Sequence, residues 1–137
     1  MSSSSNRGFV LAFDLSGSPI VQRTWETHTS EGACAAVAID SAGRIFMAGT
    51  MYGTTDLGGG PRTVSRSSAF FARYDPDLSH RSDGVITGEG DVQAYGADIG
   101  PADSTVIAGT LNGTVDLGSE PRSSAGESDG FILRFAN

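Results

Sequence analysis

The sequence contains no lysine, and its nine basic residues are all arginines. They are outnumbered by 16 acidic residues, which gives a formal net charge of -7. Proteins that bind nucleic acids or dock on anionic membranes need basic surface, and no apolar run approaches the length of a membrane span. We therefore expect no nucleic-acid partner and no membrane insertion.

Cysteine and histidine are also scarce. The single cysteine, Cys34, excludes an intrachain disulfide, and because its neighbours are alanines we expect a buried thiol that acts as a small hydrophobe. The two histidines, His28 and His80, have no metal-type spacing with each other or with Cys34. The sequence has neither an EF-hand calcium loop nor a Gly-x-Ser-x-Gly motif. It therefore predicts no metal, no cofactor and no catalytic residue.

The first seven residues differ in composition from the rest of the chain. Residues 1–7 include four serines, and they lack the apolar core of a signal peptide. We expect them to be a flexible segment. Residues 8–137 have the apolar share and the length of one modest globular domain.

The most informative feature of the chain is an internal repeat. Residues 48–62 recur as residues 108–122 with ten of the fifteen positions identical. Three similar apolar segments begin at residues 8, 69 and 130, at intervals of 61. A period of this length is typical of supersecondary units that cannot bury their apolar faces alone.

The apolar segments between these repeats favour strands. They are short, and clusters of Gly, Ser, Asp and Pro separate them at the places where a chain reversal needs such residues. No helix of ordinary length fits the pattern, and residues 14–17, 40–43 and 75–77 are typical of hairpin turns. We predict nine strands, over residues 9–13, 19–25, 33–39, 44–50, 69–74, 84–87, 93–99, 104–110 and 131–135.

Nine strands in a four-strand repeat predict a β-propeller fragment of two four-stranded blades and one extra strand. The repeats span about residues 8–68 and 69–129, and the extra strand covers residues 130–135. Two blades leave open strand edges, which promote association. We therefore expect the ring to be completed by homo-oligomerisation through the blade edges. A small closed β-barrel or sandwich with internal pseudo-twofold symmetry is the alternative.

Several of these segments resemble one family, the β-propeller repeats of surface and secreted proteins in myxobacteria and related bacteria. Residues 70–75 are similar to its Phe-Val-Ala-Arg-Tyr/Leu-Asp, residues 36–43 to its Ala-Val-Ala-Val-Asp-x-x-Gly, and residues 53–61 to its Gly-Thr-Val-Asp-Phe-Gly-Gly-Gly-Pro. The similarity covers nearly all of residues 8–135, although residues 100–103 depart from the turn pattern. The resemblance implies binding or display outside the cell.

Two charged pairs recur at matching positions of the two repeats. Asp56 matches Asp116, and Arg62 matches Arg122. A ring of such charges could hold a polar ligand. A structural role is favoured, because Asp before Leu-Gly forms turns and an Arg after Pro can pair with a neighbouring blade.

Positions that differ between the repeats are further candidates for ligand binding. Tyr52 stands where the second copy has Asn112, and Trp25 is the only tryptophan. Trp25 fits a packing wedge as well as a sugar platform.

These features predict a non-catalytic binding or scaffold module with a glycan or protein ligand. A hydrolase or lyase with its site at the propeller axis is one alternative, since some propellers are enzymes. A fragment of a longer propeller without a function of its own is the other.

Overall fold

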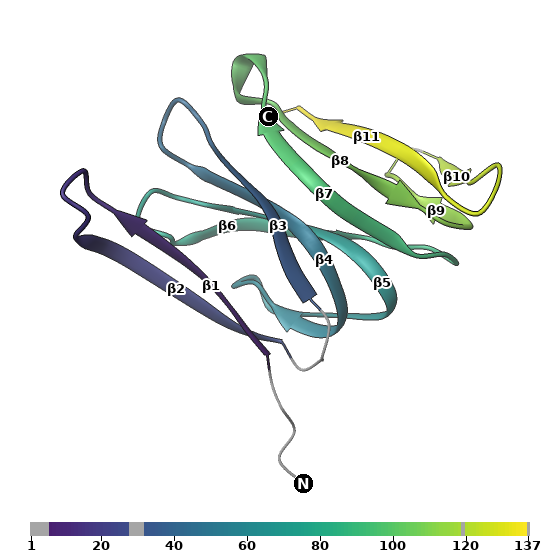
Figure 1. Cartoon of the computed structure of the whole chain (residues 1–137), viewed down its shortest axis with the longest axis horizontal. Helices are drawn as coiled ribbons and strands as arrows, with labels where there is room; N and C mark the ends of the chain where they lie inside the picture. Colours follow the sequence, from purple (N-terminus) through teal and green to yellow (C-terminus); the bar gives the residue numbers. More distant parts are fainter. Residues whose placement is uncertain (1–5, 28–31, 119, 137) are drawn as a thin grey trace, which may run out of the picture.

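The computed structural model describes residues 6–27, 32–118 and 120–136. Within these residues the chain forms β-strands and one short 3-10 turn, and no α-helix, as expected (Figure 1). The elements are β1 (Asn6–Phe13), β2 (Pro19–Thr27), β3 (Gly32–Ile39), β4 (Ile45–Asp56), β5 (Pro61–Tyr74), β6 (His80–Ile86), β7 (Val92–Ile99), η1 (Pro101–Asp103), β8 (Thr105–Leu111), β9 (Thr114–Asp116), β10 (Pro121–Ser123) and β11 (Asp129–Phe135).

The strands form three antiparallel groups that follow one another across the molecule (Figure 1). We call them the N-terminal hairpin (β1 and β2), the central sheet (β3, β4, β5 and β6 in this order) and the C-terminal sheet (β7, β8 and β11, with the small hairpin β9–β10 beside it). Only the central sheet contains four strands in sequence order. No sheet closes on itself among the described residues, so the alternative of a closed barrel is not formed.

The strand registers repeat along with the sequence. Phe9 pairs with Thr24 in the N-terminal hairpin, and Phe70 pairs with Val85 in the central sheet, 61 residues further along both strands. β1 and β2 therefore have the same relation to each other as the second half of β5 has to β6. β11 corresponds to β1 and β5, but among the described residues no strand pairs with its outer edge.

A backbone link between neighbouring groups also repeats. Thr27 of the N-terminal hairpin pairs with Thr55 of the central sheet. Gly88, which follows the central sheet, pairs in the same way with Val115 of the C-terminal sheet. The two links lie 61 and 60 residues apart in the sequence, so each repeat is joined to the preceding strands at the same place.

The repeated Ala-Gly-Thr segment has a steric reason for its glycine. β3 and β7 each contain a bulge, between Cys34 and Ala36 and between Ala94 and Gly96. The bulge brings the strand close to its neighbour, so a Cβ atom on Gly49 would lie 2.0 Å from the carbonyl oxygen of Ala33. Gly109 has the same relation to the carbonyl oxygen of Gln93, also at 2.0 Å. A side chain at either glycine would collide with backbone.

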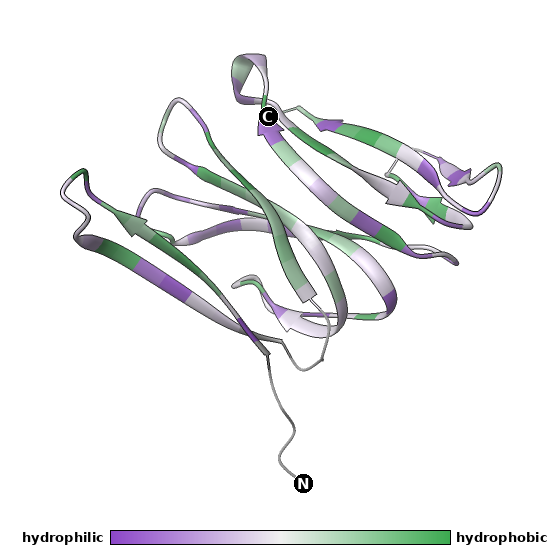
Figure 2. Cartoon of the chain, in the orientation of Figure 1, coloured by the Kyte–Doolittle hydropathy of each residue, from purple (hydrophilic) through white to green (hydrophobic). Residues whose placement is uncertain are grey.

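Two hydrophobic cores lie between the three groups. Because side chains alternate across a strand, β5 contributes to both: Phe70 and Tyr74 lie in the core against the N-terminal hairpin, and Phe71 packs against the core shared with the C-terminal sheet. Figure 2 shows hydrophobic residues along the strands of all three groups. We call the two contacts the first junction and the second junction.

The first core contains a buried hydrogen bond within the central sheet. The Tyr74 hydroxyl donates to the carbonyl oxygen of Leu57 at 2.8 Å, and burial raises the pKa of Tyr74 to about 12. The matching residue in the next repeat is Phe135, which has no hydroxyl; its ring packs against Phe71 at 4.8 Å between centroids. The repeats therefore share a backbone and differ in how their cores are filled.

The predicted turns are confirmed, whereas two details of the prediction are wrong. The backbone N–H groups of Gly17 and Gly43 donate to the carbonyl oxygens of Asp14 and Asp40, which closes both hairpins. The sequence prediction missed β9 and β10, and it ended one strand at residue 50 and began the next at residue 69, whereas β4 continues to Asp56 and β5 begins at Pro61. Cys34 is exposed rather than buried, since β3 lies on an open side of the central sheet.

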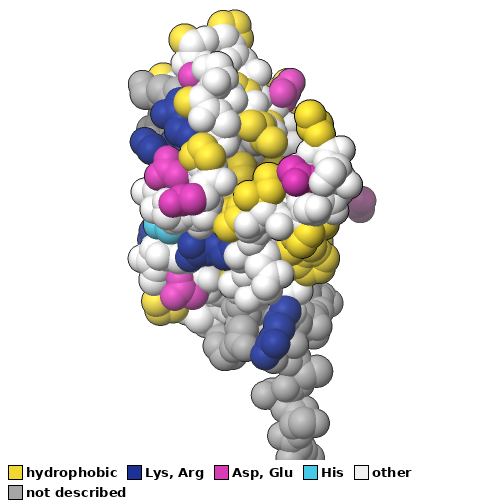
Figure 3. All heavy atoms as spheres, turned by 90° about the vertical axis from the view of Figure 1, so that its left-hand side faces the viewer, with side chains coloured by type: hydrophobic (Ala, Val, Ile, Leu, Met, Phe, Trp, Pro, Cys, Tyr) yellow, Lys and Arg dark blue, Asp and Glu magenta, His cyan; other side chains and the backbone are white. Residues whose placement is uncertain are grey.

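Both ends of the stack expose apolar side chains. Phe9 of β1 is 65% exposed, although its counterpart Phe70 is buried, and Ile132 of β11 is 76% exposed. Val37 and Ile39 of β3 are also exposed. Figure 3, turned so that the side of the N-terminal hairpin faces the viewer, shows hydrophobic side chains on this surface. The end faces lack the packing that the two junctions provide.

Candidate functional site

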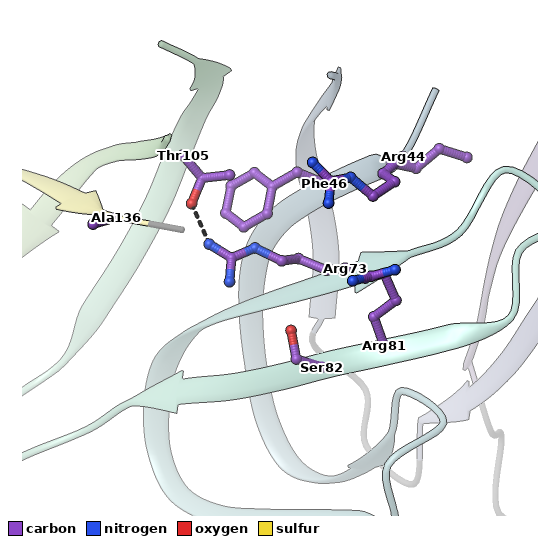
Figure 4. Close-up of a pocket in the computed structure, with 8 residues that line it drawn as sticks. Arg44, Phe46, Arg73, Arg81, Ser82, Thr105 and Ala136 are labelled. Carbon is purple, nitrogen blue, oxygen red and sulfur yellow. Dashed lines mark hydrogen bonds between the residues drawn. The ribbon is translucent and has the colours of Figure 1, made fainter. Parts of the chain in front are cut away.

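A pocket lies in the second junction, where the central and C-terminal sheets meet. It has a volume of about 390 Å³. The central sheet supplies three arginines to its wall, and β8 supplies a threonine (Figure 4). We call it the arginine pocket; its lining residues are Arg44, Ile45, Phe46, Arg73, Arg81, Ser82, Thr105 and Ala136.

Arg73 lies at the centre of the arginine pocket. Its guanidinium donates to the Thr105 hydroxyl at 2.6 Å and lies 5.5 Å from the centre of the Phe46 ring. The buried Nε atom has no hydrogen-bond partner among the described residues. Burial lowers the pKa of Arg73 below its ordinary value, and the positive charges of Arg44 and Arg81 lower it further. An arginine nevertheless remains charged in a protein.

The other two arginines have acidic partners. Arg44 bonds to Asp40 and lies 3.3 Å from a carboxylate oxygen of Asp103. Although burial alone would raise the pKa of Asp40, hydrogen bonds from Arg44 and from the turn hold it below its ordinary value. Arg81 bonds to Asp75 at 2.7 Å. Arg73 is therefore the pocket arginine without a described carboxylate partner.

Asp103 reaches Arg44 because of the irregular turn that the sequence analysis noted. Within residues 100–103, Pro101–Asp103 form the 3-10 turn, in which Ala102 and Asp103 both have a φ of 56°. Asp103 accepts a hydrogen bond from the Ser41 hydroxyl at 3.0 Å. The departure from the repeat pattern thus joins the central sheet to the C-terminal sheet beside the arginine pocket.

The matching place in the first junction carries no arginine. The residues that correspond to Arg73, Arg81, Ser82 and Thr105 in the preceding repeat are Ala12, Ile20, Val21 and Ile45. Val21 packs on the first core, and Ile45 is buried in it. The repeated fold therefore does not require an arginine at the positions of Arg73 and Arg81.

The recurring aspartates shape turns. The Asp56 carboxylate accepts hydrogen bonds from the backbone N–H groups of Gly58 and Gly60, at 2.7 and 3.1 Å. Asp116 accepts one from Gly118 at 2.8 Å. Both contacts agree with the turn-forming role that the sequence favoured.

The recurring arginines make ion pairs that differ in distance and in exposure to solvent. Arg62 bonds through Nε to Asp83 at 2.7 Å, and the second oxygen of Asp83 contacts His80, also at 2.7 Å. The Asp83 side chain is 1% exposed. Arg122 lies 3.6 Å from Glu120, and both side chains are open to solvent. The difference arises because Asp83 belongs to β6, and the C-terminal sheet has no corresponding strand among the described residues.

The remaining candidates lie elsewhere. Trp25 is buried in the first core, which fits a packing wedge. Tyr52 is exposed on β4, and the backbone N–H of Asn112 donates to the carbonyl oxygen of Asp91 at 2.9 Å. None of the seven predicted site residues lines the arginine pocket.

Sequence reasoning therefore missed the arginine pocket. One signal was present: Arg73 interrupts an apolar strand, and Arg134 stands at the same place in the next repeat. Arg44 and Arg81 carried no such signal, because they become neighbours of Arg73 only when β4, β5 and β6 pair.

Neither a metal-binding cluster nor a membrane-spanning helix is found in the described ranges. No group of three or more His, Cys, Asp or Glu side chains there could hold a metal ion. None of the helical segments in the same ranges is long and apolar enough to cross a membrane. His28 lies outside the described residues.

No protein-family model matches this sequence, and no curated protein is similar to it.

Proposed function

We propose that this chain is a non-catalytic binding or scaffold module built from β-propeller blades, with its ligand held where two blades meet. The observation that carries the proposal is the recurrence of one unit, with the same strand register, the same bulge and the same backbone link to the preceding strands. Blades around a central channel are the common architecture made from such units.

In this interpretation the three groups are parts of successive blades. The central sheet is a complete blade of four strands. The N-terminal hairpin supplies the third and fourth strands of the blade before it, because its register matches that of β5 with β6. The C-terminal sheet supplies the first three strands of the blade after it.

The open ends then define the partner, which is a further copy of the same chain. One end lacks the first two strands of a blade, and the other lacks the fourth. The β7–β8 pair of one copy would cover exposed Val37 and Ile39 of the next, in the way that β3 and β4 already pack against β7 within the chain. β1 and β11 then compete for the third position of the shared blade, so one of them is displaced.

The lining of the arginine pocket supports binding as the activity. It offers guanidinium and hydroxyl donors beside the aromatic ring of Phe46. Polar groups that fix orientation beside an apolar surface are typical of ligand sites. Whether the natural ligand is a glycan or a protein stays a prediction, as does the extracellular location that the family resemblance implies.

Sedimentation velocity over a range of micromolar concentrations tests the ring. We expect a closed species whose mass is two, three or four times the chain mass of 14.1 kDa, which corresponds to four, six or eight blades. A compact monomer at all concentrations would contradict the ring. An open-ended series of larger species would mean that the copies join without closing.

A further inference from the structure

We propose that the arginine pocket binds one oxyanion, a carboxylate, sulfate or phosphate, carried on a small organic ligand. This inference goes beyond the proposed ring, because all described parts of the pocket belong to one chain. It would hold for a single chain or for an assembly.

The first argument is the charge of Arg73. Its two arginine neighbours are neutralised by Asp40, Asp103 and Asp75, whereas Arg73 has only a neutral hydroxyl and an aromatic ring as described partners. A partly buried charge without a counter-ion is costly. An oxyanion in the pocket would supply the missing counter-charge.

The second argument is the set of donors. The Nε atom of Arg73 is buried and unpaired, and the Arg44 and Arg81 side chains lie along the same wall (Figure 4). The Ser82 hydroxyl also lines the pocket. Guanidinium groups match the planar or tetrahedral oxygens of carboxylates, sulfates and phosphates better than any other side chain does.

The third argument is the shape of the pocket. Its volume of about 390 Å³ is larger than one inorganic ion needs and falls within the range of small-molecule sites. Ile45, Phe46 and Ala136 give it an apolar side. The ligand therefore has an organic part that packs against these residues, in addition to its charged group.

The fourth argument is that the fold does not require these arginines. In the first junction the matching positions hold Ala12, Ile20 and Val21, so hydrocarbon side chains serve there. Arg134, which matches Arg73 in the last repeat, donates from Nε to the Ser104 hydroxyl at 3.1 Å. The same atom of Arg73 lacks such a partner among the described residues.

Calorimetric titration tests the proposal with four ligands that share one sugar body. D-glucuronate, glucose 6-sulfate and glucose 6-phosphate carry the three oxyanions, and D-glucose carries none. We expect at least one charged sugar to bind and neutral glucose not to bind. Affinity should fall as salt rises, because screening weakens the attraction. Equal binding of glucose and the charged sugars, or no binding by any charged sugar, would overturn the proposal.

Three variants locate the binding. R73M removes the charge and keeps an apolar stem, and we expect about a tenfold to hundredfold loss of affinity, the range for hydrogen bonds to a charged group. R73K keeps the charge without the planar fork, so its affinity should lie between those of R73M and the natural chain. The control R122Q removes an exposed arginine outside the pocket and should change nothing.

A urea titration of each variant shows whether it is folded. If R73M folds and binds as tightly as the natural chain, the pocket is not the site. If R73M is unfolded, R73K decides: unchanged affinity would overturn the proposal, and reduced affinity in a folded R73K would support it. Sedimentation of the same samples keeps the result separate from the ring, since a monomer that binds the charged sugar would contradict only the ring.

Discussion

The first and second junctions have the same backbone plan and different fillings. In both, a strand at the end of one group makes a single backbone pair with the hairpin of the next repeat. The first junction contains Trp25 and the Tyr74 hydroxyl bond. The second contains the tilted ring pair of Phe71 and Phe135 and, beside it, the arginine pocket. Residues that are shared by the two repeats therefore set the arrangement of the sheets, while residues that differ determine which side chains fill the space between them.

The comparison extends to the two end faces, which are junctions with one side missing. Phe9 stands on β1 where Phe70 stands on β5, yet Phe9 is exposed and Phe70 is 3% exposed. The same side chain thus occupies a core in one repeat and a surface in the other. A further copy of the chain would make the two positions alike.

The largest expected effect separates these two phenylalanines. Phe70→Ala should lower the free energy of unfolding by about 3–5 kcal/mol, because it leaves a cavity in the first core. Phe9→Ala should change it by no more than about 0.5 kcal/mol at dilutions where the chain is monomeric, because the ring already meets water. Urea unfolding followed by tryptophan fluorescence measures both.

Phe9, whose substitution should hardly affect the stability of the monomer, should matter for association between copies. Phe9→Ala should weaken association, as measured by sedimentation, because the Phe9 side chain would be buried against the next copy. If Phe9→Ala neither destabilises the monomer nor weakens association, β1 is not part of an interface between copies.

A smaller loss of stability is expected from substitutions that test whether the bulge and the glycine beside it are equivalent in the two repeats. Gly49→Ala and Gly109→Ala should each cost about 1–3 kcal/mol, because the new Cβ forces neighbouring backbone to shift. Gly96→Ala is the control, since a Cβ there meets nothing within 4 Å. Urea midpoints of the three variants give the comparison. Similar stabilities for Gly49→Ala and Gly96→Ala would show that the close approach at Gly49 is absent.

The smallest expected change in stability comes from exchanging the residues at one position of the two backbone links. The Thr55 hydroxyl is buried without a described partner, and the matching residue in the next repeat is Val115. Thr55→Val should therefore stabilise the chain by about 1 kcal/mol, since it removes an unpaired polar group. The reverse change, Val115→Thr, should destabilise it. Thermal unfolding measures both, and a loss of stability in Thr55→Val would reveal a hydrogen bond to its hydroxyl.

The sequence predicted the strands and turns well because their signals are local. Alternating apolar residues and Asp-rich turns act within a few positions, and the repeat allowed each segment to be compared with a second copy. The turn-forming aspartates, Asp56 and Asp116, were recognised for the same reason.

The exposure of Cys34 and the arginine pocket could not be predicted in this way. Cys34 lies in an alanine run that is typical of a buried inner strand, but the strands that would cover it are absent from the described part of the chain. The pocket joins Arg44, Arg73 and Thr105, which become neighbours only through sheet pairing and packing. Such contacts depend on tertiary structure, which local patterns do not encode.

Amide hydrogen exchange at the two outer strands tests the ring most directly. The account predicts that the outward amides of one competing strand, β1 or β11, gain protection when concentration rises from the monomeric to the associated range, while the displaced strand loses protection. Those of β8, which is paired on both sides, should change little. Association that leaves β1, β2 and β11 exchanging as fast as in the monomer would contradict a ring joined through these edges.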